Sequence, residues 1–148
     1  MSAGRRAQEC VEGPARPELI DAVHEGLDRL RASVPGIGAM DAMAFELAVI
    51  EVVANSIEHT RAADVRVPVY LAVELKSGDG ELCARIFEHG TEPVQISGES
   101  PGMPHLHAES GRGLALLERL LSSVAFERIP DGSVWTLILK TAGAHGPS

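Results

Sequence analysis

A strict alternation of apolar and other residues over residues 65–76 constrains the fold of this chain more than any other feature of its sequence. Every second residue of this run is Val or Leu, and the set comprises Val65, Val67, Val69, Leu71, Val73 and Leu75. The period of two predicts a half-buried strand, and Pro68 places its early part at an edge or a bulge. The turn residues 77–80 follow, and residues 81–87 return as the second arm of a hairpin.

Three other segments carry the helical period. The first is amphipathic and extends from Pro17 to just before Pro35. The second extends from an expected N-cap at Asp41 to about Thr60. The third is expected over residues 113–122. Helices and strands therefore alternate in a pattern that one small domain can accommodate.

Two further strands are expected near residues 124–128 and 134–140, joined by a turn at Pro130-Asp131-Gly132. Between the hairpin and the third helix, residues 88–110 contain several glycines and prolines with almost no periodicity. A stretch of this length without regular structure is functional or mobile. Together the elements predict a two-layer α/β (α+β) sandwich, with helices on one face of a mixed, mostly antiparallel sheet.

The chain length of 148 residues and its 45% hydrophobic composition fit one domain with a substantial core. We place this domain at residues 17–141. Residues 1–16 are expected to form a flexible tail with one short strand near residues 7–11. Residues 142–148 are expected to form a second flexible tail.

The formal net charge of −8 would repel a phosphate backbone, so nucleic acid is not an expected partner. Cys10 and Cys83 lie far apart in the chain, which favours reduced thiols over a disulfide framework. No secretory signal and no run of membrane-spanning length is recognised, so no membrane is expected as a partner. The predicted location is the cytoplasm.

The second helix carries polar groups on a largely apolar background. Several of its apolar residues follow the spacing of a core face, namely Met43, Leu47, Ile50, Ala54 and Ile57. Glu51 and Asn55 lie one turn apart on one face, and His59 continues the same line. Two interpretations stay open: this face looks at solvent, or Glu51 is a general base and Asn55 offers its amide oxygen to a divalent cation.

Glycines flank the start of the third helix, in Ser110-Gly111-Arg112-Gly113-Leu114. The first N–H groups of a helix have no internal partners and attract anions. Glycines let the backbone approach a phosphate closely, and Arg112 adds positive charge. A tight loop with a Ser110 cap is the alternative, and a lone Gly-x-Gly does not decide between the two.

Taken in order, these two motifs resemble the ATP-binding domain shared by gyrase-type, chaperone, histidine-kinase and MutL-type ATPases. The likeness covers about residues 17–140 and is strongest to the bacterial anti-sigma factor serine kinases. In that family an N-box Glu-x-x-x-Asn lies on a helix, and Glu51 and Asn55 match it, with His59 where a His is frequent. The family's glycine box matches Gly111-Arg112-Gly113-Leu114.

Two further segments enter the same resemblance. The closing residues 132–136 resemble the family's last strand, whose Thr lies near the adenine, and Thr136 is the Thr assigned here. After the hairpin the family has Asp-x-Gly-x-Gly, whose Asp accepts a hydrogen bond from the adenine amino group. This chain has Glu88 in place of the Asp, keeps Gly90, and carries Glu92 in place of the second glycine.

The resemblance implies ATP and Mg²⁺ as ligands of the histidine-kinase-like ATPase fold. By position, Asn55 would hold the magnesium and Glu51 would take the proton from a serine hydroxyl of a partner protein. Backbone N–H groups of residues 111–113 would cradle the phosphates, and residues 94–110 would form a lid. Phosphoryl transfer requires positioning and charge neutralisation, which this set supplies.

The resemblance therefore implies an ATP-dependent protein-serine kinase that phosphorylates an anti-sigma factor antagonist and sequesters a sigma factor in a partner-switching pathway, as a homodimer. The alternative is a non-catalytic protein-interaction module of the same fold with weak or lost ATP binding, which the altered residues 88–93 favour. A detached ATPase lobe of a histidine kinase is less favoured, because no phosphoacceptor helix pair is recognised in the sequence.

Overall fold

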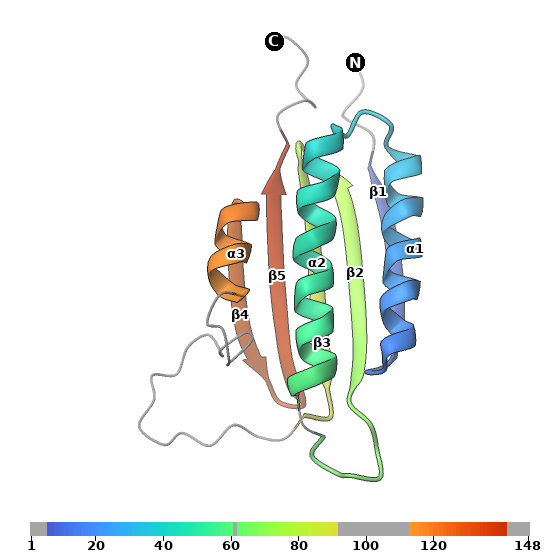
Figure 1. Cartoon of the computed structure of the whole chain (residues 1–148), viewed down its shortest axis with the longest axis vertical. Coiled ribbons are helices and arrows are strands. Elements are labelled where there is room, and N and C mark those ends of the chain that lie inside the picture. Colours follow the sequence, from blue (N-terminus) through green and yellow to red (C-terminus); the bar gives the residue numbers. More distant parts are fainter. Residues whose placement is uncertain (1–5, 61, 92–112, 142–148) are drawn as a thin grey trace.

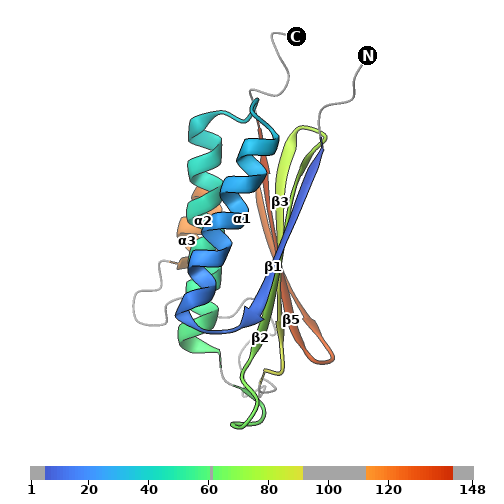
Figure 2. The ribbon, with the colours of Figure 1, turned by 90° about the vertical axis from the view of Figure 1, so that its right-hand side faces the viewer.

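Three helices lie on one face of a five-stranded sheet in the part of the chain that this computed structural model describes, residues 6–60, 62–91 and 113–141 (Figure 1). The helices are α1 (Pro17–Ser33), α2 (Ala39–His59) and α3 (Gly113–Leu120). The strands are β1 (Ala7–Pro14), β2 (Tyr70–Gly78), β3 (Glu81–His89), β4 (Ser123–Ile129) and β5 (Gly132–Lys140). Turned by 90°, the molecule shows the helices on one side of the sheet only (Figure 2).

The strand order is β1-β2-β3-β5-β4, and each neighbouring pair is antiparallel. The predicted two-layer α+β sandwich is confirmed. The expectation of a mixed sheet is wrong for the described strands, because their pairing is antiparallel throughout. The β2–β3 hairpin turns at Asp79 and Gly80, whose positive φ angles of 55° and 77° fit a two-residue turn.

The N-terminal strand β1 pairs with β2 along its whole length, from Ala7 opposite Ser77 to Pro14 opposite Tyr70. The short strand expected near residues 7–11 is present and extends to Pro14, so the expected flexible tail is wrong for residues 7–14, which form part of the sheet. Val11 and Gly13 are buried beneath α1. The full length of β1 was not predicted, because Val11 is the one branched apolar residue among residues 7–14.

The alternating run beginning at Val65 becomes a strand only from Tyr70 onward. Val65 is 95% exposed and Val67 is 56% exposed. The chain turns here instead, because the Val67 N–H donates to the carbonyl of Asp64, and Pro68 has no N–H to give to a ladder. From Leu71 onward the predicted alternation holds, with Leu71, Val73 and Leu75 buried.

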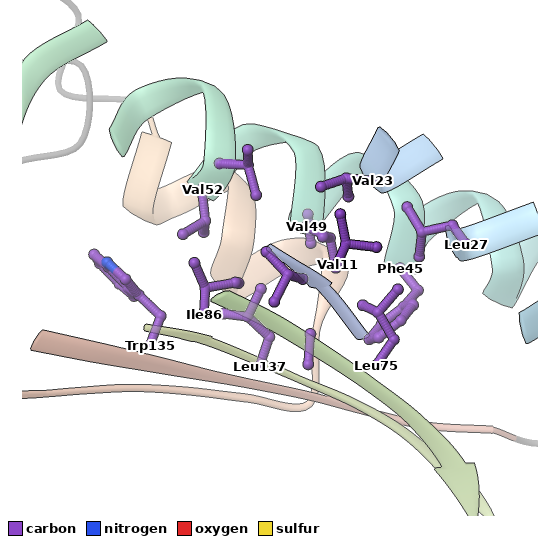
Figure 3. Packing of buried hydrophobic residues seen from close by; sticks show 14 of the residues in the cluster. Val11, Val23, Leu27, Phe45, Val49, Val52, Leu75, Ile86, Trp135 and Leu137 are labelled. Carbon is purple, nitrogen blue, oxygen red and sulfur yellow. The ribbon is translucent and has the colours of Figure 1, made fainter. Parts of the chain in front are cut away.

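Helix α2 lies over the middle of the sheet, and its core face differs from the predicted one. The buried apolar residues of α2 are Phe45, Ala48, Val49, Val52 and Val53. Met43 and Leu47, which follow the expected core spacing, are 57% and 52% exposed. Figure 3 shows Phe45, Val49 and Val52 packed toward the sheet. The helix also begins two residues before Asp41, with Gly38 at the N-cap.

The sheet presents its own apolar residues to α2 and α1, among them Ile86, Trp135 and Leu137 (Figure 3). Val23 and Leu27 complete this layer from α1. Fully buried side chains of this kind contribute roughly 1.5–3 kcal/mol each by removal from water. Among the described helices, none combines the length and the apolar composition that a membrane crossing requires.

Candidate functional site

Glu88, the next-to-last residue of β3, is a buried carboxylate that faces the helices and is 7% exposed. Its Oε2 accepts hydrogen bonds from Ser56 Oγ at 2.5 Å and from Thr60 Oγ1 at 3.2 Å. Its Oε1 accepts a hydrogen bond from Ser133 Oγ. A buried charge is costly unless hydrogen bonds stabilise it. The three hydroxyl groups supply this stabilisation and hold the carboxylate in one orientation.

The local structure explains why these hydroxyls meet Glu88. Ser56 and Thr60 lie one turn apart at the C-terminal end of α2, so both side chains point the same way. Ser133 is the residue of β5 directly opposite Glu88, and residues directly opposite in a sheet share a face. We refer to Glu88, Ser56, Thr60 and Ser133 as the carboxylate cluster.

Two glycines frame the carboxylate cluster. A Cβ atom on Gly132 would lie 1.7 Å from the carbonyl oxygen of Glu88, so no larger residue fits there without moving the backbone. Gly90 has a φ of 78°, in the region that favours glycine. Its N–H donates to the carbonyl of Asp131 at 2.8 Å, and its carbonyl accepts from the Ala63 N–H at 2.8 Å.

Glu51 and Asn55 lie on the part of α2 that precedes Ser56. Asn55 is only 8% exposed, and Glu51 is half-buried with its Oε2 shielded from solvent. The interpretation in which this face simply looks at solvent therefore does not hold for Asn55. His59 is exposed at the end of the helix, with Nε2 3.5 Å from Glu58 Oε1. Glu51 and Asn55 are thus the two members of this line that the fold shields.

Thr136 does not lie beside Glu88. Thr136 lies three positions after Ser133 on β5, and an odd spacing places the two side chains on opposite faces of the sheet. Thr136 is paired with Arg85 and faces away from the helices. The assignment of Thr136 is corrected here: the β5 hydroxyl near Glu88 belongs to Ser133.

The glycine box is described only from Gly113, which is buried at the start of α3. Leu114 packs partly buried against the core. Gly111 and Arg112, together with the lid expected over residues 94–110, lie outside the described residues. Sequence reasoning did not single out Ser56, Thr60 or Ser133. Ser56 could have been found from the sequence, because it is a polar residue directly after Asn55 on a largely apolar helix.

The arrangement offers one carboxylate, one amide and three hydroxyls near the end of β3 and the C-terminal half of α2. Magnesium is usually held through one or two protein oxygens together with substrate phosphates and water. The amide oxygen of a buried Asn55 fits that mode of binding. The cluster of Glu88 can accept a hydrogen bond from a ligand amino group, because a carboxylate has about four acceptor sites.

A hollow lies elsewhere, at the opposite end of β3 from Glu88. It has a volume of about 470 Å³ and is lined by Arg6, Lys76, Asp79 and Cys83, among others. None of the candidate residues lines it. The carboxylate cluster is the candidate site, because its buried polar groups converge on one carboxylate. The charged groups of the hollow include the exposed pair Arg6–Asp79.

A comparison with protein families bears on the nature of the site. The sequence profile of the histidine kinase-like ATPase domain matches residues 13–139. The chain belongs to this family. Domains of the histidine kinase-like ATPase family generally bind ATP with Mg²⁺, and the family includes anti-sigma factor serine kinases. No curated protein matches the chain.

Family membership agrees with the architecture described above, three helices on one face of an antiparallel sheet. The match begins at residue 13 and so takes in the end of β1. It also extends to residue 139, within β5, and thus contains Glu51, Asn55, Glu88 and Ser133.

Proposed function

We propose that this chain is an ATP-dependent protein-serine kinase of the anti-sigma factor type. It phosphorylates an anti-sigma factor antagonist and sequesters a sigma factor in a partner-switching pathway. The observation that carries this proposal is the buried carboxylate of Glu88, oriented by three hydroxyls next to the helix turn of Asn55. A histidine kinase-like ATPase domain supplies the scaffold for such a site.

In this proposal Glu88 recognises the nucleotide base. Three of the roughly four acceptor sites of its carboxylate are used by Ser56, Thr60 and Ser133, which leaves one for an exocyclic amino group. The hydroxyls fix the direction of that remaining acceptor. A base with a carbonyl at the same position would place two acceptors against each other, so adenine is favoured over a base such as guanine or hypoxanthine.

The remaining roles follow along α2. Asn55 offers its amide oxygen to Mg²⁺, which neutralises phosphate charge when it is bound. Glu51 takes the proton of the serine hydroxyl of the antagonist, and it lies half-buried one helical turn before Asn55. The glycine box would bind the phosphates through backbone N–H groups, and Gly113 at the start of α3 is its described end. The protein works in the cytoplasm as a homodimer and makes no direct contact with nucleic acid.

Nucleotide binding is tested by thermal unfolding of the full chain with Mg-ATP. A ligand that binds only the folded state raises its stability as RT ln(1 + [L]/Kd). We expect millimolar Mg-ATP to raise Tm, Mg-GTP to raise it less, and Asn55→Ala to remove most of the response. Glu127→Gln, at an exposed position of β4, is the control, and Mg-ATP should raise the Tm of this variant as much as that of the unaltered protein.

Phosphoryl transfer is tested by incubating the protein with labelled ATP and a candidate antagonist. We expect label on a serine of the antagonist, and Glu51→Gln should abolish transfer while Mg-ATP still raises Tm. Transfer by Glu51→Gln at the rate of the unaltered protein would remove Glu51 from the proposed role. Binding of ATP without transfer of label to any antagonist would contradict the proposed kinase activity.

A second candidate function is a non-catalytic protein-interaction module of the same fold with weak or lost ATP binding. Glu88 and Glu92 stand where the family has Asp and Gly, and this favours the second candidate. The same thermal unfolding experiment separates the two, because this module shows no change in Tm at millimolar Mg-ATP.

A further inference from the structure

Helix α2 is apolar on its outer face as well as on its core face. Met40, Met43 and Leu47 are 78%, 57% and 52% exposed. Their spacing of three and four residues places them on one line of the helix, on the side opposite Phe45 and Val49. We call Met40, Met43 and Leu47 the outer stripe. A helix that is apolar on both sides is usually covered on both sides.

The apolar line that contains the outer stripe continues along α2 toward its C-terminal end. Ile50 and Ala54 carry on the same line and are partly exposed. From Met40 to Ala54 the helix rises about 21 Å, which is about four turns. This is the length over which one helix of a partner can lie along another. Methionine is also common on surfaces that bind helices, because its side chain adapts to the shape of its partner.

The neighbouring helix α1 carries an acidic row beside the outer stripe. Glu18, Asp21, Glu25 and Asp28 are all exposed, and their spacing of three, four and three residues places them on one face. Figure 1 shows α1 alongside α2 in the same layer. His24 Nδ1 lies 2.6 Å from Glu46 Oε2 and joins the two helices. Acidic row and outer stripe therefore share one outward surface.

In the described part of the chain, the arginines of α1 and its N-cap are Arg16, Arg29 and Arg31. Arg16 precedes the first residue of α1, at the end of the acidic row. The guanidinium of Arg29 is directed to Glu9 of β1, with Nε 2.8 Å from Oε1. Arg31 lies in the last turn of α1, beyond the row. A small hollow of about 30 Å³ between α1 and α2 is lined by Asp28, Arg31 and Phe45 among others, and it lies on the core side of α2 rather than on the outer stripe. The outward surface of the two helices thus combines exposed apolar residues on α2 with a row of carboxylates on α1.

From this combination we propose that the α1–α2 surface is a docking site for a basic amphipathic helix of a partner protein. The apolar face of that helix covers Met40, Met43 and Leu47, and its Lys or Arg residues lie against the acidic row. Charge of opposite sign steers such a partner and sets its orientation, while apolar burial supplies most of the affinity. An anionic membrane does not fit, because the acidic row would repel it.

This docking site is independent of the proposed kinase activity. It uses the outward face of α1 and α2, whereas Glu88 and its hydroxyl partners face the interior between α2 and the sheet. Failure of one proposal therefore leaves the other standing. Loss of peptide binding with retained Mg-ATP binding, or the reverse, separates them.

The test uses a synthetic 18-residue helix with Leu at helical spacing on one face and Lys and Arg beside it. Its fluorescence anisotropy is measured against the full chain. Two peptides serve as controls. The first has the same composition in scrambled order, and the second has Glu in place of each Lys and Arg. We expect binding of the basic amphipathic helix only.

Variants locate the binding on the molecule. Met43→Gln with Leu47→Gln should weaken binding by at least about tenfold, and Leu116→Gln on α3, where Leu116 is 40% exposed, should leave it unchanged. Asp21→Asn with Asp28→Asn should slow association and reduce its dependence on salt. Circular dichroism and urea unfolding establish that each variant is folded.

Three outcomes would overturn the docking site. The first is equal binding of the scrambled peptide, which would show attraction by net charge alone. The second is no binding of the basic helix at millimolar concentration. The third is a dimer in sedimentation that Met43→Gln with Leu47→Gln dissociates, because a second copy of this chain would then occupy the surface.

Discussion

Ser133 at the start of β5 and Glu88 near the end of β3 lie directly opposite each other, and Ser133 Oγ donates a hydrogen bond to Glu88 Oε1. Ser133 is 1% exposed and Glu88 is 7% exposed. The bond therefore joins two strands inside the protein rather than at its surface. It also fixes the carboxylate that we assign to base recognition.

Removal of this hydroxyl is the first prediction. Ser133→Ala leaves a buried carboxylate with one donor fewer, and a buried group that loses its partner costs about 1–3 kcal/mol. We expect the free energy of unfolding, measured with urea, to fall by that amount. Ser133→Thr keeps a hydroxyl on the same face and should retain most of the stability.

Thr136→Val provides the control for this change. Thr136 is on the same strand but on the face away from Glu88. The Thr136→Val variant should therefore differ from the unaltered protein by no more than about 0.5 kcal/mol in its free energy of unfolding. Equal losses for Ser133→Ala and Thr136→Val would contradict a special role for the bond to Glu88.

The confusion of Thr136 with Ser133 shows what sequence alone cannot settle. Both residues belong to a strand whose approximate position was predicted correctly. Which of them faces Glu88 depends on the register of β5 against β3, and a shift of one residue exchanges the faces. Register is a property of the assembled sheet, so a single sequence does not reveal it.

Helix α2 gives a second example. Its existence and its end near Thr60 were predicted from periodicity, and both are confirmed. The predicted core face of α2 is wrong, because Met43 and Leu47 have the same helical spacing as Phe45 and Val49, which are the buried residues. Periodicity identifies one core face only when the other face is polar. The second apolar face of α2, which misled the prediction, contains the outer stripe that we propose as a docking site.

The β2–β3 hairpin marks the opposite case. Leu71, Val73 and Leu75 are buried as their alternation predicts, since one face of the sheet is covered by helices and the other is not. The pattern failed only at Val65 and Val67, where the chain turns before the sheet begins. Alternation shows which residues share a face, and it does not show where pairing starts.

The second prediction concerns the close approach at Gly132. In Gly132→Ala the new Cβ would lie 1.7 Å from the carbonyl oxygen of Glu88, so β5 must move away from β3. Overpacking of this kind costs typically about 1–3 kcal/mol, and a backbone collision belongs at the upper end. We expect this loss in urea unfolding, together with weaker stabilisation by Mg-ATP because Glu88 is displaced.

Gly36→Ala is the matched control. No atom lies within 4 Å of a Cβ built on Gly36, so its free energy of unfolding should change by less than about 1 kcal/mol. A stable Gly132→Ala with an unchanged response to Mg-ATP would show that the end of β3 tolerates a wider separation from β5.

The third prediction tests whether β1 belongs to the domain. A Cβ on Gly26 of α1 would lie 2.7 Å from Val11 Cγ2 of β1. Gly26→Ala improves helix propensity by about 1 kcal/mol, but the collision costs about 1–3 kcal/mol, so we expect a net loss of stability. Val11→Ala removes the colliding methyl groups and should relieve that loss.

A double-mutant cycle in urea measures this relief. The combined change Gly26→Ala with Val11→Ala should cost less than the sum of the single changes by at least about 0.5 kcal/mol. Gly36→Ala with Val11→Ala should be additive, because a Cβ on Gly36 would meet no atom within 4 Å and therefore does not contact Val11. Additivity in the first pair would show that β1 does not press on α1 in solution.

The fourth prediction concerns the two thiols. Burial raises the pKa of the Cys83 thiol, and the carboxylate of Glu81 raises it further, while Lys76 and Arg85 oppose this effect. The thiolate is the reactive form, so a raised pKa lowers the thiolate fraction at a given pH. Cys10 is exposed on β1. We expect Cys10→Ser, which leaves Cys83, to react with iodoacetamide more slowly than Cys83→Ser at pH 8.

The sign of the pH dependence follows from the same shift. Because the pKa of Cys83 is raised, its alkylation should reach half of its maximal rate at a higher pH than that of an ordinary thiol. Glu81→Gln in the Cys10→Ser background should speed the reaction, and Lys76→Gln should slow it. In concentrated urea the two thiols should react at similar rates, because burial is lost. A Cys83 that reacts as fast as Cys10 in the folded protein would contradict the half-buried position of β3 at this residue.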